Sequence, residues 1–326
     1  MSRTASLGVL LAMGLLSACG TSSSVSREVA SPSLTVTTTT ATTTTAPPET
    51  TAAPAFAFTG QPVPVAPQSA SEAATTIEEA MRVLRSEDDA AWSAAGHQLQ
   101  VTVRSLTRHP DWQEDVMAAL PTDIAVLTQR HLNARRSLGL LHQGFEPQPE
   151  LPRWEIIEPE PLDQLIDHYQ EAEAATGINW QILAAINLIE TGMGRIDGLS
   201  TAGAQGPMQF LPTTWEEVAE GGDIDDPHDA IQGAARYLVR RGGLDDIRKG
   251  LWGYNNSDYY VDAVLTYAQM FTDDLSALRA VYHWEIYVGS TEGPLWLPVG
   301  FIAAEGQTAT QYLAENPWAL TLPATG

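Results

Sequence analysis

The stretch Trp180-Gln-Ile-Leu-Ala-Ala-Ile-Asn-Leu-Ile-Glu190 decides the fold, because it is the most hydrophobic helix that this chain can contain. Its apolar residues recur at helical spacing and form one buried stripe: Ile182, Leu183, Ile186 and Ile189. The stripe places Glu190 beside an apolar wall, which disfavours the charged form of the carboxyl and raises its pKa. The sequence therefore predicts a helix that ends on a proton donor. The alternative is a surface glutamate paired with Arg195.

A glycine-rich segment follows Glu190 and runs to Trp215. Its glycines predict loops in which the backbone approaches a neighbouring group closely, and Pro212 opens a short helix. Asp197 is the one other carboxylate before Glu216. This scarcity favours a site with a single working acid.

The flanking sequence predicts further helices with recognisable ends. Gly177 is placed as the left-handed stop of a helix that begins near Leu162, and Asn179 can cap the acid-bearing helix. Asp226 and Ser257 can cap two more helices downstream.

The rest of the chain divides by composition. Apolar residues at helical intervals over 72–146 predict a helical segment of unknown role, whose histidines are too dispersed for a zinc site. Prolines over 147–161 mark a connector, and a helical domain is expected over 162–275. Two apolar runs within the C-terminal extension, 276–326, predict a β-hairpin. The expected fold is mostly α-helical with a small β element.

Residues 1–18 are typical of an export signal. A short apolar stretch leads to Leu16-Ser-Ala-Cys19, which resembles a lipobox. Cys19 is the chain's one cysteine, so no internal disulfide is expected, and lipid modification is favoured over an inert buried thiol. Residues 19–71, rich in Thr, Ala and Pro, predict an extended disordered tether after the lipidated N-terminus. We therefore expect an exported protein held by lipid at the outer face of the cell membrane.

The charge balance argues against nucleic acid as a partner. The chain has 40 acidic and 17 basic residues, a formal net charge of -23. Phosphate binding needs clustered Lys and Arg. A solvated acidic surface accounts for most of this excess.

Three motifs occur in order along the chain: Glu190-Thr191, Gly206-Pro207-Met208-Gln209 and Gly253-Tyr254-Asn255. With them, the chain from about Leu162 to Phe271 resembles the lysozyme-like lytic transglycosylases of bacterial cell walls. The longer runs 200–215 and 254–264 resemble the actinobacterial branch of that family, the murein transglycosylase lipoproteins. Family members typically have Glu-Ser, Gly-any-Met-Gln and Ala-Tyr-Asn in this order. Threonine in place of serine keeps a hydroxyl, and glycine in place of alanine leaves the tyrosine beside it.

The resemblance implies a helical domain with a small β element that acts in the cell wall on peptidoglycan strands. It implies cleavage of the β-1,4 bond between N-acetylmuramic acid and N-acetylglucosamine. Glu190 is then the general acid, and the 6-hydroxyl of the muramic acid attacks its own anomeric carbon. The same glutamate, now ionised, takes the hydroxyl proton, and a 1,6-anhydro sugar results. No metal or organic cofactor enters this scheme, and the resemblance names no partner among the proteins of wall synthesis or division.

Five residues of the motifs are expected to bind or position substrate: Thr191, Met208, Gln209, Tyr254 and Asn255. Tyr254 is expected to hydrogen-bond Glu190 or the sugar, with a core tyrosine as the alternative. Gln209 can bind the N-acetyl group or the attacking hydroxyl, or else bond loop backbone. Met208 is expected to wall the cleft, Thr191 to orient the acid or satisfy a helix-end carbonyl, and Asn255 to contact glycan or form a turn.

Two alternatives stay open at this point. A hydrolytic muramidase would cut the same bond with water and needs a second carboxylate, for which the candidates are Asp197, Asp223, Asp225 and Asp226. A non-catalytic wall-binding lipoprotein would keep the fold without the activity, although the retained Glu190 argues against it.

Overall fold

The structure, a computed structural model, describes residues 57–322 of the chain. The expected signal peptide, Cys19 and residues 20–56 of the expected tether lie outside the described residues. Helices dominate the described part, with two small antiparallel strand pairs, so the expected fold class is confirmed. None of the helices within 57–322 is both long and apolar enough to cross a bilayer.

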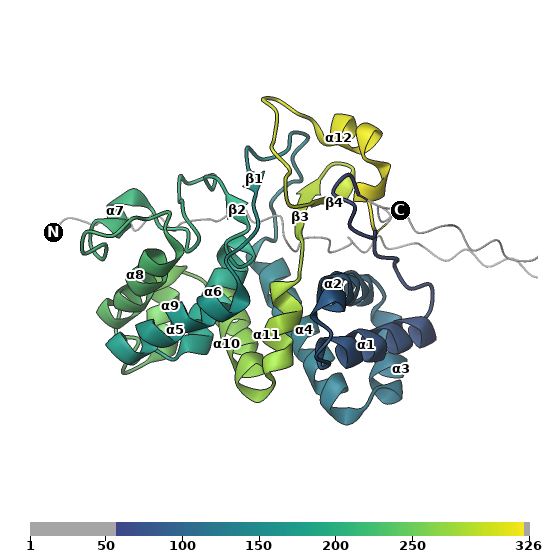
Figure 1. Cartoon of the computed structure of the whole chain (residues 1–326), viewed down its shortest axis with the longest axis horizontal. Coiled ribbons are helices and arrows are strands. Elements are labelled where there is room, and N and C mark those ends of the chain that lie inside the picture. Colours follow the sequence, from purple (N-terminus) through teal and green to yellow (C-terminus); the bar gives the residue numbers. More distant parts are fainter. Residues whose placement is uncertain (1–56, 323–326) are drawn as a thin grey trace, which may run out of the picture.

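Four helices precede the acid-bearing part of the chain and form one side of the molecule (Figure 1). They are α1 (Ala70–Leu84), α2 (Trp92–Arg108), α3 (Gln113–Ala119) and α4 (Thr122–Leu141). Ser69 caps the start of α1, where its side chain accepts the backbone N–H of Glu72. Along α1 the buried positions recur at helical spacing, which places Ile77 and Leu84 on the face turned toward α2 and α3.

The second group of helices builds the other side and the centre. It comprises α5 (Leu162–Thr176), α6 (Trp180–Thr191), α7 (Pro212–Trp215), α8 (Pro227–Arg240), α9 (Ile247–Tyr254), α10 (Asp258–Asp273) and α11 (Leu275–Tyr282). The expected ends are confirmed: Gly177 stops α5 with φ 81°, and side chains of Asn179, Asp226 and Ser257 cap α6, α8 and α10.

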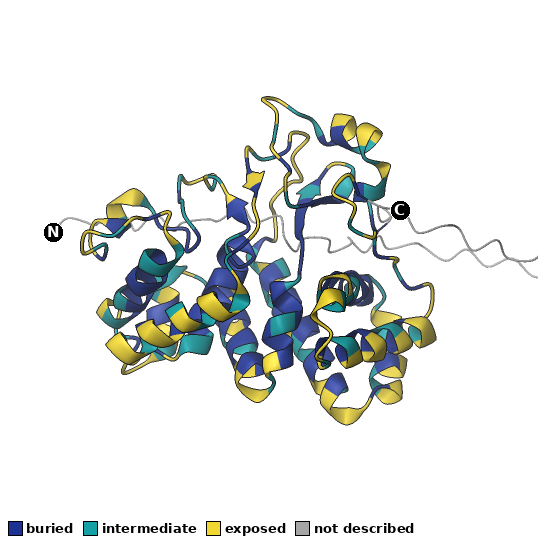
Figure 2. Ribbon diagram, viewed as in Figure 1, coloured by how far each residue is buried: buried dark blue, intermediate teal, exposed yellow. Residues whose placement is uncertain are grey.

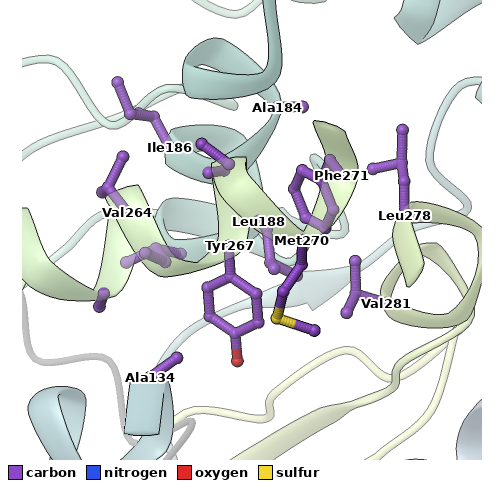
Figure 3. Packing of buried hydrophobic residues seen from close by; sticks show 14 of the residues in the cluster. Ala134, Ala184, Ile186, Leu188, Val264, Tyr267, Met270, Phe271, Leu278 and Val281 are labelled. Atoms are coloured by element: carbon purple, nitrogen blue, oxygen red, sulfur yellow. The ribbon is translucent and has the colours of Figure 1, made fainter. Parts of the chain in front are cut away.

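Helix α10 packs against both α4 and α6, so the two groups of helices share one apolar core. In Figure 3, Ala134 of α4, Leu188 of α6 and Tyr267 of α10 lie in the same cluster as Val281 of α11. Figure 2 shows the central helices buried over most of their surface, with exposed residues on the outer helices. The segment 72–146 is therefore packed onto α10, which in turn packs onto the acid-bearing helix α6.

The strands lie above the central helices α6, α10 and α11 in Figure 1. Strand β1 (Glu155–Ile156) pairs antiparallel with β2 (Ile196–Asp197), just after the acid-bearing helix. Strands β3 (Ile286–Ser290) and β4 (Gly293–Leu297) form a hairpin, at the residues where one was expected. The short helix α12 (Ala309–Glu315) follows this hairpin.

A second apolar cluster unites the proline-rich connector with the C-terminal extension. Trp154 and Ile156 of the connector pack with Leu295, Phe301 and Tyr312. A further small cluster joins Ala57 to buried residues of the hairpin and of α2. The packed chain therefore starts earlier than the boundary expected at residue 72, because apolar residues near 57–66 cover the hairpin.

Candidate active site

Helix α6 delivers Glu190 to the end of the central core. The side chain of Asn179 accepts the N–H of Gln181 at its start, and Gly192 ends it in the left-handed conformation at φ 62°. Between these caps nearly every residue is buried, and Glu190 itself is only 2% exposed. The apolar sequence of α6 therefore buries the carboxyl of Glu190 at the edge of the core.

The surroundings of Glu190 keep a proton on it. Burial raises the pKa of Glu190 to about 8, against the opposing effect of a hydrogen bond from Tyr260. The Tyr260 hydroxyl donates to Oε1 of Glu190 at 2.7 Å. Arg195 does not pair with this acid: its guanidinium lies over the ring of Tyr282, 5.2 Å from the centroid. At neutral pH the carboxyl is therefore mostly protonated.

The loop Gly206–Gln209 is fastened next to the acid through its backbone carbonyls. The carbonyl oxygen of Pro207 accepts two hydrogen bonds from α6, from Thr191 Oγ1 at 2.6 Å and from Asn187 Nδ2 at 2.9 Å. The carbonyl of Met208 accepts the hydroxyl of Tyr254 at 2.8 Å. Buried backbone carbonyls need such partners, so these side chains determine where the loop sits.

This network explains why the three motifs occur together. Thr191 from the first motif and Tyr254 from the third each bind a carbonyl of the second. Thr191 Oγ1 also accepts the N–H of Gly194 at 3.0 Å, a role that needs a hydroxyl and not serine in particular. The motifs are thus one hydrogen-bonded unit around the acid.

The cleft that contains Glu190 is walled by aromatic and polar residues; we call it the acid cleft. Its lining consists of Glu190, Gln209, Phe210, Leu211, Thr214, Tyr237, Tyr254 and Asn255. The ring of Tyr254 stacks on that of Tyr260 with centroids 6.3 Å apart, and Phe210 lies 5.7 Å from Tyr254. These rings keep the surroundings of the acid apolar while one side stays open.

Residues 167–275 match the family model for the transglycosylase SLT domain. The resemblance to lysozyme-like lytic transglycosylases is thereby confirmed for about a third of the chain. A membrane-bound lytic murein transglycosylase F from Thiobacillus denitrificans is 34% identical over 81 residues, which are 25% of this chain and 17% of that relative. The chain thus matches less than a fifth of this relative's length. No solved structure matches the chain.

Within this transglycosylase domain, three of the residues expected to bind or position substrate act through the loop or the core and do not line the cleft beside Glu190 as expected. Tyr254 donates to the Met208 carbonyl and not to Glu190, because it ends α9 with its hydroxyl turned toward the loop. Met208 is fully buried in the main apolar cluster and does not line the acid cleft, contrary to the expected wall. Thr191 is also fully buried and holds the loop.

Gln209 and Asn255 do reach the acid cleft of the domain. Gln209 adopts a left-handed backbone conformation, φ 50°, and its side-chain Nε2 donates to the carbonyl of Gly206 at 3.0 Å. The side chain therefore bonds the backbone of its own loop, which was the alternative to binding the N-acetyl group or the attacking hydroxyl. Its amide oxygen, which cannot donate, is left to accept a hydrogen bond from a hydroxyl or an amide in the cleft.

Tyr260 is the site residue that sequence reasoning missed. It lies on the buried face of α10, where Tyr267 lies two turns further on. Both tyrosines are almost completely buried, at 1% exposed. Nothing in the sequence separates the tyrosine that reaches the acid from the one that packs in the core, because the difference lies in how α10 crosses α6.

The four aspartates that were candidates for a second carboxylate are exposed. Asp197, Asp223, Asp225 and Asp226 all lie at the surface, and none of them lines the acid cleft. The pKa of Asp225 is raised by partial burial and by the nearby charges of Asp223 and Asp197. Among the residues that the structure describes, Glu190 is the one carboxylate of the cleft lining.

One group in the described chain has the composition of a cation site. Asp226, His228 and Asp229 lie close together at the start of α8. His228 Nδ1 is already 3.1 Å from Asp229 Oδ1, and the positive end of a helix dipole disfavours a bound cation. None of the three residues lines the acid cleft, so the chemistry of Glu190 does not involve them.

Proposed function

We propose that the protein is a peptidoglycan lytic transglycosylase that cleaves the β-1,4 bond between N-acetylmuramic acid and N-acetylglucosamine. One observation carries the proposal. Glu190 is buried, holds a proton at neutral pH, and has no second carboxylate beside it in the described lining of the acid cleft. The match to the transglycosylase SLT domain supports the same reaction class.

The reaction needs one proton donor that later becomes a proton acceptor. Protonated Glu190 gives its proton to the glycosidic oxygen as the bond from the muramic acid anomeric carbon to that oxygen breaks. The 6-hydroxyl of the same sugar then forms the new bond to the anomeric carbon, and the carboxylate of Glu190 takes its proton. The acid is thereby restored, no water is consumed, and the product is 1,6-anhydromuramic acid.

The surrounding residues supply position and a dry environment. Tyr260 fixes one oxygen of the acid by a hydrogen bond, and the acid lines the cleft. Because Tyr260 donates, its hydrogen bond also stabilises the carboxylate that forms when the proton leaves. Phe210 and Tyr254 limit the access of water to the acid. A fixed geometry of this kind is a large part of what a catalytic group contributes.

A hydrolytic reaction has less support. It requires a second carboxylate, on the opposite face of the sugar or poised as nucleophile, about 5–9.5 Å from the first. The nearby aspartates are exposed and outside the cleft lining. Mass analysis of the products separates the two reactions: digestion of purified peptidoglycan is expected to give muropeptides one water lighter than reducing-end products. Release of reducing-end muropeptides alone would exclude the transglycosylase.

The activity is expected to fall at alkaline pH. The acid must be protonated when substrate binds, and burial raises the pKa of Glu190 to about 8. The value of kcat/KM is therefore expected to be flat from neutral pH to about 8 and then to fall about tenfold per pH unit, as the protonated fraction falls. A profile measured on soluble glycan strands tests this, and an optimum that declines already from pH 5 would contradict it.

We further propose that the protein is exported and lipid-anchored at the outer face of the cell membrane through Cys19. The sequence before and at this residue supports it, and the name of the Thiobacillus denitrificans relative includes the words membrane-bound. A Cys19→Ala variant that stayed in the membrane fraction as completely as the parent protein would refute lipid anchoring at this position.

A further inference from the structure

One residue of the acid cleft wall is bonded to an arginine at the end of α8. Tyr237 lines the acid cleft and is only 6% exposed. Its hydroxyl oxygen accepts a hydrogen bond from Arg241 Nη2 at 2.6 Å, and the guanidinium carbon lies 4.7 Å from the centre of its ring. Arg241 itself directly follows α8 and is exposed. A charged group at the surface therefore holds a buried residue of the cleft wall.

The arginine also determines where the hydroxyl proton of Tyr237 goes. A guanidinium has donors only, so the phenol oxygen accepts from Arg241 and its own proton is left for another acceptor. That acceptor is the carbonyl oxygen of Gly253, 3.2 Å away. Gly253 lies in the last turn of α9, where carbonyls lack partners within the helix. Because a charged donor strengthens the next hydrogen bond in a chain, Arg241 strengthens the bond that satisfies the end of α9.

The contacts continue from Tyr237 to the acid. The ring of Tyr237 packs edge-on against that of Tyr254, with centroids 5.5 Å apart and an interplanar angle of 80°. Tyr254 comes directly after Gly253, so Tyr237 fixes both the ring of Tyr254 and the backbone before it. The ring of Tyr254 in turn stacks on Tyr260, which donates to Glu190. Packed side chains thus connect the surface to the acid without a gap.

Gly253 leaves the space that Arg241 occupies. A Cβ at position 253 would lie 3.0 to 3.1 Å from Cβ, Cγ and Cδ of Arg241, closer than ordinary van der Waals contact. The arginine would have to move, and its exposed side chain can do so, but the movement would weaken its bond to Tyr237. Gly253 lies in a helix and has no positive φ, so the backbone does not require glycine there.

We propose that Arg241 is a positioning residue for the reaction, acting through Tyr237 to hold Tyr254 beside the acid, and that residue 253 is glycine so that Arg241 can reach Tyr237. The inference rests on the proposed function, because it concerns the same cleft. A purely structural role is the alternative, since an arginine at the C-terminus of a helix also interacts favourably with the helix dipole. The two roles differ in how activity and stability respond to substitution.

A double-mutant cycle tests the link between the two residues. It compares kcat and KM on soluble glycan strands for the parent protein, Arg241→Ala, Tyr237→Phe and the double variant. Each single change is expected to lower kcat about tenfold, less than the roughly hundredfold cost of a 1 Å misplacement, with KM changed less than about twofold. The double variant is expected to lose no more than Tyr237→Phe alone, because both changes remove the same bond. Losses that multiply, or a parent-like kcat in Arg241→Ala, would overturn the proposal.

Gly253→Ala displaces the arginine without removing it. Alanine favours a helix more than glycine does, so this variant is expected to unfold at a temperature no lower than that of the parent. Its kcat is nevertheless expected to fall about tenfold, because Arg241 leaves Tyr237. In an Arg241→Ala background, Gly253→Ala is expected to cause no further loss. A purely structural role would instead lower stability and activity together, and a parent-like kcat in Gly253→Ala would contradict the proposal.

Arg240→Ala is the matched control. Arg240 neighbours Arg241, pairs with Glu217 at 3.1 Å and lies outside the lining of the acid cleft, so the parent's kcat is expected. A loss as large as that of Arg241→Ala would show that any positive charge at this helix end has the same effect, against the proposal.

The rates count all soluble muropeptides, whichever kind is released, so this inference and the proposed function can fail separately. If the parent protein gave only reducing-end products while the losses in the cycle did not multiply, the proposed reaction would be wrong and the role of Arg241 would stand. Losses that multiply in an enzyme that releases anhydro products would refute the role of Arg241 alone.

Discussion

Replacing Glu190 by glutamine is expected to lower the release of soluble muropeptides about a thousandfold, within the range that general acid–base catalysis contributes. Glutamine has nearly the same shape and can still accept the hydroxyl of Tyr260, which bonds Oε1 in the parent protein. It cannot donate a proton to the glycosidic oxygen. The loss should therefore appear in kcat, while strand binding is largely retained. The measurement is the initial rate of muropeptide release from purified peptidoglycan.

The matched controls are Asp197→Asn and Asp225→Asn. Both carboxylates are exposed and outside the acid cleft lining, so these variants are expected to work at close to the parent rate. A loss in either variant as large as that of Glu190→Gln would mean that a second carboxylate takes part, which favours hydrolysis.

Glu190→Gln is also expected to change how the stability of the protein depends on pH. The pKa of Glu190 is raised from 4.5 to about 8 in the folded protein, so its contribution to the free energy of unfolding is fully present below pH 4.5 and is lost as the pH rises through about 8. Glu190→Gln removes this dependence. The free energy of unfolding of the parent is therefore expected to fall relative to that of the variant between these pH values, which denaturant titrations at several pH values can measure.

Gly206→Ala is expected to disrupt the active site and to cause the largest loss of activity after Glu190→Gln. Gly206 has φ 74°, and a Cβ there would lie 2.0 Å from the carbonyl oxygen of Ile224. The loop has to move, and it carries Gln209 as well as the two carbonyls held by Thr191 and Tyr254. A misplacement of about 1 Å at a catalytic site costs about a hundredfold in rate. We expect that loss of activity and a loss of about 3 kcal/mol in stability.

Gly203→Ala provides the control in the same loop. Gly203 has a similar φ of 81°, but nothing lies within 4 Å of a Cβ built there. Its alanine variant should carry the cost of the left-handed backbone alone, about 1 kcal/mol, and keep nearly full activity. The two variants are compared by thermal unfolding and by muropeptide release. Equal losses of stability and activity in the two variants would show that the close approach of Gly206 to Ile224 is not needed to position the loop.

Local features of the fold could be predicted because they depend on residues that are neighbours in the sequence. The apolar run of α6, its cap Asn179 and the glycine stop at Gly177 are properties of neighbouring residues, and the structure has each of them. The burial that raises the pKa of Glu190 follows from that run as well. The hairpin of β3 and β4 was marked by two apolar runs around glycines.

Features that depend on distant contacts could not be predicted in the same way. Periodicity indicated that α4 has an apolar face, but not that this face would pack on α10. Strand β1 has two residues and forms through pairing with β2, about 40 positions later in the chain. For the same reason the sequence points to Tyr254 as a hydrogen-bond partner of Glu190 or of the sugar, whereas the crossing of α10 over α6 brings Tyr260 to Glu190.

Muropeptide mass analysis of the parent protein beside Glu190→Gln tests the central claim most directly, because it examines the reaction type and the acid together. Purified peptidoglycan is digested with each protein under the same conditions. We expect 1,6-anhydro muropeptides from the parent protein and almost none from the variant. Reducing-end products from the parent, or equal release of anhydro products by the two proteins, would contradict the account.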